Sequence, residues 1–328
     1  MTILSINLTI IAFFIRQLSF FFALRNDGLV PHFNSRFKMS LIEKLVTNIQ
    51  LKKKTIVVST IQLPSLSKKI SIAPEQIEEF RRNGHTLTRN IISREELAPY
   101  RQAILEATAK FNTEKKKIAD RDTYGKAFLQ IMNLWTRDEN VRKFVMARRF
   151  GKIAADLLGV RNVRIYHDQA LFKEAGGGPT PWHQDQYYWP IDTHNTVTMW
   201  MPLVDINVEM GMLTFASGSY QSGFALNKEI SDESEHDFDD IVAQKNYPVT
   251  RAEMMHGGDA TWHYGFTIHK APGNDSDKMR EVMTIIYIAD GAKITQPKNQ
   301  WQENDHKTWL KSKKVGSLAD SALNPLVL

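Results

Sequence analysis

The first half of the chain carries apolar residues at helical spacing, interrupted by residues that start and stop helices. Residues 73–84 place Pro74 near the beginning of such a pattern and Gly84 just after its end, where helices favour these residue types. Ser93 and Glu96 have the spacing of a capping box and predict the start of a second helix. The pattern therefore predicts a mostly helical N-terminal half.

A further pair of helices is predicted before the chain changes character at Gly159. Thr136 and Glu139 have the spacing of another capping box. The apolar residues over 141–159 then recur with helical period. We expect two consecutive helices that end at Gly159.

The second half consists of short segments rich in β-branched and aromatic residues, bounded by Gly, Pro, Asn and Asp. Such segments predict the strands of an antiparallel sandwich or barrel. The four clearest are VRIYHDQALF (163–172), TVTMWMPLVDI (196–206), MLTFA (212–216) and VMTIIYIA (282–289). Two polar segments, EAGGGPTP (174–181) and SDESEHDFDD (231–240), are predicted to be exposed loops.

Residues 1–38 do not fit either pattern. We interpret this apolar segment as an extension outside the fold, either an organelle-targeting peptide or sequence upstream of a true start at Met39. A stable membrane span is not expected, because Arg16 would lie near the bilayer centre at a cost of about 2.5–3.5 kcal/mol. Residues 39–328 are expected to form a single domain, cytoplasmic unless the extension directs it to an organelle.

Composition narrows the classes of function. The chain is 42% hydrophobic and 24% charged, which is typical of a globular protein with a sizeable core. Its formal charge of +6 comes from lysines in short scattered runs without a nucleic-acid-binding motif, so no nucleic-acid partner is expected. The chain has no cysteine, and any metal must therefore be held by His, Asp or Glu.

The segment WHQDQYYWP (182–190) contains the most informative pair of residues. His183 and Asp185 are two positions apart, and on an extended strand their side chains would point to the same face. Such a pair can be part of a metal site, a surface ion pair or a coincidence. His263 and His269 lie near the last predicted strands. Two histidines and one carboxylate with open positions form the ligand set of non-haem Fe(II) oxygenases.

Arg280 follows His269 by eleven residues, on the strand that leads into VMTIIYI. In a barrel this position can carry the guanidinium into the pocket that holds the metal. A buried arginine needs an anion, and its fork matches a carboxylate. A dicarboxylate cosubstrate that chelates iron at one end would satisfy the arginine at the other. The alternative is a surface salt bridge.

Four segments together resemble a known family in order, spacing and flanking residues. They are FRRNGHTLTRNIISREELAPYRQAI (80–104), QALFKEAGGGPTPWHQDQYYWP (169–190), WMPLVDINVEMGMLTFASGSY (200–220) and HKAPGNDSDKMR (269–280). The resemblance is to the phytanoyl-CoA dioxygenase-like Fe(II)/2-oxoglutarate-dependent oxygenases, which include the ectoine hydroxylases. It covers roughly residues 74–290.

The resemblance implies an α+β protein with a mainly β core, a double-stranded β-helix (a cupin-like jelly roll) at about residues 160–292, and an N-terminal helical support. It also implies roles for particular residues. His183, Asp185 and His269 would bind the iron, while His263 would be a neighbour of the site. Arg280 would bind 2-oxoglutarate with Trp200 beside it, and Gln169 and Trp189 would face the substrate, as in the ectoine branch.

Two positions depart from the family pattern. Tyr220 stands after Gly218 and Ser219 where the family often has histidine, which suggests a divergent pocket. Ala271 stands two residues after His269, where the family often has Ser or Thr that helps to hold 2-oxoglutarate. Neither departure touches the three proposed ligands. Tyr187 and Tyr188 would line the mouth of the site or pack against the fold.

The resulting hypothesis is an Fe(II)- and 2-oxoglutarate-dependent dioxygenase that hydroxylates, or otherwise oxidises a C–H bond of, a small-molecule substrate. It would use O2, convert 2-oxoglutarate to succinate and CO2, and need a reductant such as ascorbate in vitro. The alternatives are a zinc hydrolase on a similar barrel and a non-catalytic cupin-like binding protein. A hydrolase needs no second carboxylate anchor, and Arg280 therefore favours the oxygenase.

Overall fold

The computed structural model describes residues 62–121, 123–226 and 228–328, so the extension expected at residues 1–38 lies outside the described part. Within that part no helix has both the length and the apolar character needed to cross a bilayer. The α-helices are α3 (Pro74–Asn83), α4 (Arg94–Phe111), α5 (Thr123–Ala127), α6 (Glu139–Val145), α7 (Arg148–Leu158), α8 (Asp232–Gln244) and α9 (Gln300–Thr308).

The helices of the first half begin and end where the sequence signals lie. Pro74 is the first residue of α3, and Gly84 follows the helix with a positive φ of 79°. Ser93 and Glu96 form both hydrogen bonds of the capping box at the start of α4. Gly159 ends α7 with a φ of 68°. These helix ends are set by local contacts, and the predictions for them are confirmed.

The strands form two main antiparallel sheets and a two-stranded ribbon. The large sheet has the order β1-β10-β5-β12-β3-β2, the small sheet β4-β11-β7-β8, and the ribbon β6-β9. Their bounds are β1 (His85–Thr88), β2 (Leu129–Met132), β3 (Val163–Lys173), β4 (Thr180–His183), β5 (Thr196–Pro202), β6 (Ile206–Asn207), β7 (Thr214–Ala216), β8 (Val249–Arg251), β9 (Met254–Met255), β10 (Ala260–Tyr264), β11 (His269–Ala271) and β12 (Arg280–Ala289).

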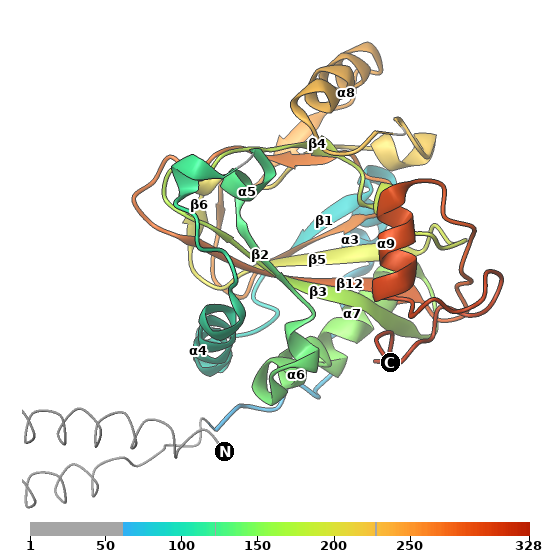
Figure 1. Cartoon of the computed structure of the whole chain (residues 1–328). Helices are drawn as coiled ribbons and strands as arrows, with labels where there is room; N and C mark the ends of the chain where they lie inside the picture. The colour runs from blue at the N-terminus through green and yellow to red at the C-terminus, as the bar shows by residue number, and fades with distance from the viewer. Residues whose placement is uncertain (1–61, 122, 227) are drawn as a thin grey trace, which may run out of the picture. The chain divides into compact units, whose positions relative to one another are not determined.

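The large sheet has a helix-covered outer face. Ile165, Met199 and Ile285 on this face belong to one buried apolar cluster with Phe150 and Leu157 of α7. In Figure 1 helices α6 and α7 lie below the large sheet, whereas β4 and then α8 lie above it. Alternate residues of β3 and β12 therefore point toward helices, and the residues between them point toward the small sheet. This arrangement is the jelly roll with helical support that was expected.

Two local predictions are wrong. Residues 231–240 were expected to be an exposed loop, but they form most of α8, because Phe238 and Val242 are buried against Trp182 of the small sheet. Thr136 does not cap a helix. Asp138 does, accepting hydrogen bonds from two backbone N–H groups at the start of α6.

The helical first half also contributes two strands that periodicity did not indicate. Strand β1 pairs with β10, and β2 pairs with β3, so both extend the edges of the large sheet. Each has only four residues. A segment this short carries too few alternating positions for its pattern to be distinguished from a loop.

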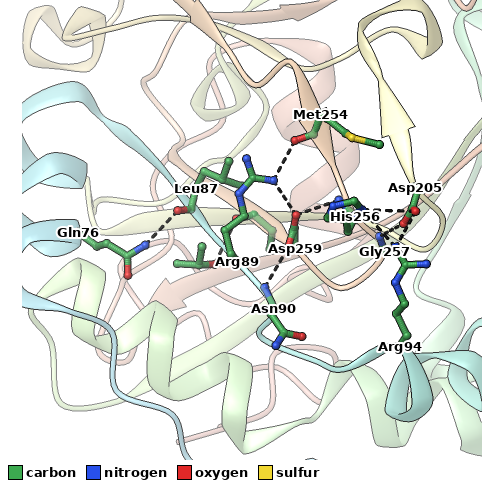
Figure 2. A network of polar contacts seen from close by, with 12 residues as sticks. Gln76, Leu87, Arg89, Asn90, Arg94, Asp205, Met254, His256, Gly257 and Asp259 are labelled. Carbon is green, nitrogen blue, oxygen red and sulfur yellow. Dashed lines mark hydrogen bonds and ion pairs between the residues drawn. The ribbon is translucent and has the colours of Figure 1, made fainter.

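A polar network fixes the turn from which β10 begins (Figure 2). Asp259 accepts hydrogen bonds from Arg89 at 2.8 Å and from the backbone of Asn90 and His256. Asp205 accepts from Arg94 at 2.7 Å and from the backbone of Gly257. The network ties this turn to β1 and to the start of α4. Strand β10 is therefore held in register at the end where it enters the sheet.

Candidate metal centre

Three potential metal ligands converge between the two sheets. His183 is the last residue of β4, and His269, its partner across the strand pair, is the first of β11. Asp185 is the first residue of a short 3-10 helix, Asp185–Tyr188. The donor atoms of the three residues all lie within 4.8 Å of one another. Asp185 Oδ1 is 3.6 Å from His183 Nε2 and 3.7 Å from His269 Nε2.

His183 and Asp185 converge by the route expected. Strand β4 ends at His183, but Gln184 keeps an extended backbone with φ −122° and ψ 123°, and the 3-10 helix begins only at Asp185. Side chains on either side of an extended residue point to the same face. The prediction that the pair converges on an extended backbone is therefore correct.

The two imidazoles are oriented by backbone carbonyls. His183 Nδ1 lies 2.8 Å from the carbonyl oxygen of Pro181, and His269 Nδ1 lies 2.9 Å from that of Thr267. A carbonyl only accepts, so each Nδ1 carries the hydrogen and each Nε2 keeps its lone pair. Metal-binding histidines are held in this way in proteins generally. The residues present therefore fit a divalent metal.

The carboxylate of Asp185 is held by a second set of contacts. Thr198 Oγ1 donates to Oδ2 at 2.8 Å, and His263 Nε2 lies 3.3 Å from the same oxygen. Thr198 and His263 are cross-strand partners on β5 and β10. Oδ1 is thereby left to face the two imidazoles. His263 contacts the Asp185 oxygen that does not face the two imidazoles. This agrees with its expected place as a neighbour of the site.

The protonation states suit metal binding. Burial by itself would raise the pKa of Asp185, but the imidazoles of His269, His183 and His263 around the carboxylate hold this pKa well below its usual range. Burial lowers the pKa of His269 well below its usual value, and His183 and His263 lower it further. At neutral pH the cluster therefore contains an ionised carboxylate and a neutral His269. These are the forms in which both residues bind metals.

Removing the hydroxyl that positions Asp185 should weaken the metal site. Thr198→Val keeps the shape of the side chain but loses the 2.8 Å hydrogen bond to Oδ2. We expect metal affinity to fall by about 10- to 100-fold, as is usual when an outer-shell partner is lost. The measurement is competition for Fe(II) or Mn(II) with a chelator.

Thr261→Val is the matched control for this prediction, since Thr261 lies on β10 in the same interior and its hydroxyl has no hydrogen-bond partner. It should bind metal as the unaltered protein does. Equal loss of affinity in both variants would contradict a specific role for Thr198.

Arg280 lies in the same interior, where β12 begins. It is 2% exposed, and one guanidinium nitrogen donates to the carbonyl oxygen of Gly211 while Nε has no partner. No carboxylate of the described residues lies within salt-bridge distance of it. Burial lowers the pKa of Arg280 to about 9, so the group remains charged at neutral pH. A buried charge of this kind calls for an anionic ligand.

The face that carries Arg280 also carries Trp200, predicted to lie beside the cosubstrate, and Gln169, predicted to face the substrate. In the strand register Thr284 of β12 stands opposite Gln169 of β3 and Trp200 of β5. The guanidinium carbon of Arg280 is 5.3 Å from the centre of the Trp200 ring. Gln169 Nε2 lies 3.5 Å from His167 Nδ1. The structure thus brings Arg280, Trp200 and Gln169 to the interior that also holds the three metal ligands.

Trp189 is placed differently. Its ring is 5% exposed and belongs to an apolar cluster with Ile286 and Ile288, 5.5 Å from the ring of Tyr166. Tyr187 and Tyr188 pack toward α9, where Gln302 donates to the carbonyl oxygen of Tyr187 and the Tyr188 ring meets that of Trp301. Both tyrosines therefore pack against the fold, which is the second of the two arrangements predicted for them.

The two departures from the family pattern have different consequences. The Tyr220 hydroxyl donates to the carbonyl oxygen of Arg81, and its ring stacks on Tyr264 at 4.8 Å, away from the metal ligands. Ala271 is buried in an apolar cluster with Trp200 and Val282. Only the Ala271 departure therefore lies beside the residues that surround Arg280.

Sequence reasoning missed two histidines in this interior. His167 is 3% exposed and points to the same face as Gln169, two residues further along β3. His85 stands opposite His263 across the β1–β10 pair, stacks on Phe215 at 4.3 Å and contacts Ser217 Oγ at 2.8 Å. The alternation of β3 was a signal that could have found His167. Nothing local indicated His85, since β1 itself was not predicted.

A jelly roll with an interior cluster of two histidines and one aspartate, and with a buried unpaired arginine, has the features of the non-haem iron, 2-oxoglutarate-dependent oxygenases. The comparison with protein families identifies the particular branch. The model of the phytanoyl-CoA dioxygenase (PhyH) family matches residues 80–282, and the chain belongs to this family. The resemblance seen in the sequence is thereby confirmed.

The chain is similar to one curated protein in sequence and to several solved structures in fold. A probable alpha-ketoglutarate-dependent hypophosphite dioxygenase from Stutzerimonas stutzeri is 24% identical over 234 residues, which are 66% of this chain and 79% of that protein. The carbocyclase SnoK from nogalamycin biosynthesis is 23% identical with a TM-score of 0.65, covering 81% of this chain and 99% of its own. The epimerase SnoN, solved with Fe3+, alpha-ketoglutarate and nogalamycin RO, is 20% identical with a TM-score of 0.63, covering 77% and 98%. At these identities the structural likeness establishes the fold.

Proposed function

We propose that the protein is an Fe(II)/2-oxoglutarate-dependent oxygenase that oxidises a C–H bond of a small-molecule substrate and converts 2-oxoglutarate to succinate and CO2. His183, Asp185 and His269 hold the iron, and Arg280 binds the far carboxylate of 2-oxoglutarate. One observation carries this proposal. A fully buried arginine without an acidic partner shares an interior with a two-histidine, one-carboxylate cluster.

Each protein group has a defined task in this reaction. Iron held by the three ligands would supply the activation of O2 for attack on a C–H bond, coupled to loss of CO2 from 2-oxoglutarate. Because only two imidazoles and one carboxylate would hold the metal, it would keep room for cosubstrate and O2. Arg280 fixes the cosubstrate at its other end through a fork that matches a carboxylate. Trp200 and Val282 surround that end with apolar surface, which strengthens the charge–charge contact by excluding water.

The substrate is proposed to bind beside Gln169. A cavity of about 630 Å³ is lined by β2, by Phe111 and by Trp309. Met132 of β2 stands opposite Gln169 in the sheet, and the Trp309 ring lies 6.0 Å from the ring of His167. The cavity is not lined by the metal ligands. Its volume is within the range of small-molecule sites. The amide of Gln169 is suited to orient a substrate that reaches the metal from this cavity. Trp189 is proposed to bound the substrate on the side of the metal ligands away from the cavity.

The activity itself is tested by turnover of 2-oxoglutarate. Purified protein with Fe(II), ascorbate and O2 should produce succinate, and a panel of metabolites should include some that accelerate succinate formation and gain mass. Zn(II) in place of Fe(II) should support neither. A protein that releases no succinate with any metal and substrate would be a binding protein, and one active with Zn(II) on a hydrolysable ester or amide would be a hydrolase.

The proposed reaction inserts oxygen and does not insert halide. Asp185 occupies the position of the carboxylate ligand, and halide would have to displace it or another ligand. We expect product formed under 18O2 with excess chloride to carry one 18O atom, with a second in succinate, when the outcome is hydroxylation. Mass spectrometry of both products is the measurement. A chlorinated product from the unaltered protein would contradict the role given to Asp185.

A further inference from the structure

A second buried basic residue lies beside Arg280. Lys173 is the last residue of β3 and stands opposite Arg280 across the β3–β12 pair, so the two side chains start from the same face of the sheet. Lys173 is 0% exposed and Arg280 is 2% exposed. Neither has a carboxylate partner among the described residues. The acidic residue next in sequence, Glu174, is paired with Arg121.

The one hydrogen bond that the Lys173 side chain makes to the described residues does not explain why a lysine is buried here. Its Nζ donates to the carbonyl oxygen of Gly178, in the glycine-rich loop before β4. That loop is already fixed by Asn274, whose side chain donates at 3.1 Å to the carbonyl oxygens of both Lys173 and Glu174. An ammonium group has three donors. Two of them remain for a ligand.

We propose that Lys173 is a second cosubstrate-binding residue, and that its ammonium group and the guanidinium of Arg280 hold the far carboxylate of 2-oxoglutarate between them. This inference rests on the proposed function and adds to it a residue that no sequence motif indicated. A carboxylate has two oxygens with about four acceptor positions, which is enough for both cations. The anion also offsets the repulsion between the two groups when Lys173 carries its proton.

The electrostatics support the same arrangement. Burial, and then the charge of Arg280, lowers the pKa of Lys173 to about 6. A carboxylate bound between the two groups would raise this pKa again, because it favours the charged amine. Binding of 2-oxoglutarate above pH 6 should therefore take up a proton. The other charged side chains on the surrounding elements are Glu174 with its partner Arg121, Glu281 with its partner Arg101, Lys126 on α5, Glu209 beside Gly211, and Asp275, Asp277 and Lys278 in the loop before β12.

The first experiment measures the Kd of 2-oxoglutarate by titration calorimetry on the Mn(II)-loaded protein without O2. Lys173→Met should raise this Kd by about 10- to 100-fold, since a hydrogen bond to a charged group is lost. Lys126→Met is the matched control. Lys126 contacts the same loop, where its carbonyl oxygen accepts from the backbone of Gly178 at 2.8 Å, and its loss should leave the Kd unchanged. Thermal melting and Mn(II) affinity should be unaltered in both variants.

The second experiment measures proton uptake, which a purely structural lysine would not affect. Calorimetry in buffers of different ionisation enthalpy should show that the unaltered protein takes up about one proton per 2-oxoglutarate at pH 8. Its Kd should rise by up to about tenfold for each pH unit above 6 until the pKa of the bound state is reached. In Lys173→Met both the uptake and the pH dependence should disappear.

The outcomes separate this inference from the proposed function. If the unaltered protein does not bind 2-oxoglutarate, the proposed function fails and the inference falls with it. If it binds 2-oxoglutarate but Lys173→Met has the same Kd, the inference alone is wrong. Should Lys173→Met fail to fold, Lys173→Gln is the second variant, and an unchanged Kd in Lys173→Gln would equally overturn the inference.

Discussion

Arg280→Ala is expected to raise the Kd and the KM for 2-oxoglutarate by roughly 30- to 5,000-fold. Truncating one partner of a buried charge pair costs about 2–5 kcal/mol, and each 1.4 kcal/mol is a factor of ten. The guanidinium is fully buried, has no acidic partner of its own and lies against Trp200. Metal affinity should change little, because the contacts that orient His183 and Asp185 do not involve Arg280. Calorimetry and steady-state succinate formation give the two constants.

Two further variants define the origin of this loss. Arg280→Lys keeps the charge but lacks the planar fork, and it should recover only part of the affinity. Arg101→Ala is the control, because Arg101 pairs with Glu281, the next residue of β12, on the outer face of the sheet at 2.6 Å. It should bind 2-oxoglutarate normally. An unchanged Kd in Arg280→Ala would place the anchor elsewhere.

His183→Ala and Asp185→Ala are expected to abolish coupled turnover and to lower metal affinity by more than about 100-fold. Loss of an outer-shell partner already costs 10- to 100-fold, and loss of a direct ligand costs more. The proteins should remain folded, since neither side chain belongs to the apolar clusters that join sheet and helices. Metal content after dialysis, circular dichroism and succinate release test the three parts of this expectation.

The control for the ligand variants is His194→Ala. His194 is an exposed histidine whose ring contacts Phe266 at 4.7 Å. Its loss should leave metal content unchanged. Iron retained at full occupancy in both ligand variants, with turnover intact, would end the assignment of this site.

The two anchors lie on different sheets, and this has a consequence for ligand binding. His183 and His269 belong to β4 and β11 of the small sheet, whereas Arg280 belongs to β12 of the large sheet. Variants of the first set should therefore lose metal and cosubstrate together, because 2-oxoglutarate chelates the iron. Variants of Arg280 and Lys173 should lose cosubstrate alone.

Much of the helical half was determined by local sequence. The capping box of Ser93 and Glu96, Pro74 at a helix start and Gly159 at a helix end act through contacts within a few residues, so a sequence pattern suffices to predict them. The local signal is wrong where two caps compete. Asp138 lies one residue before α6 and its carboxylate accepts two backbone hydrogen bonds, so it caps the helix in place of Thr136.

Helix α8 shows the opposite case, in which burial decides. Its sequence is dominated by acidic residues and was interpreted as a loop, but Phe238 and Val242 fall on one face and are covered by Trp182 and Ile268. Glu235 and Asp239 then accept hydrogen bonds from the backbone and the ring of Trp182. Two apolar residues are a weak signal in the sequence. They stabilise a helix here because a sheet lies against them.

For the site, the sequence alone determined which residue types are present and in what order: His183 and Asp185 two positions apart, His269 far along the chain, and Arg280 eleven residues later. Only the tertiary structure decided what surrounds them. Thr198 and His263 reach Asp185, and Lys173 stands opposite Arg280, because antiparallel strands remote in sequence are paired in a particular register. Register is set by which faces are buried over the whole sheet, and no local stretch of sequence contains that information.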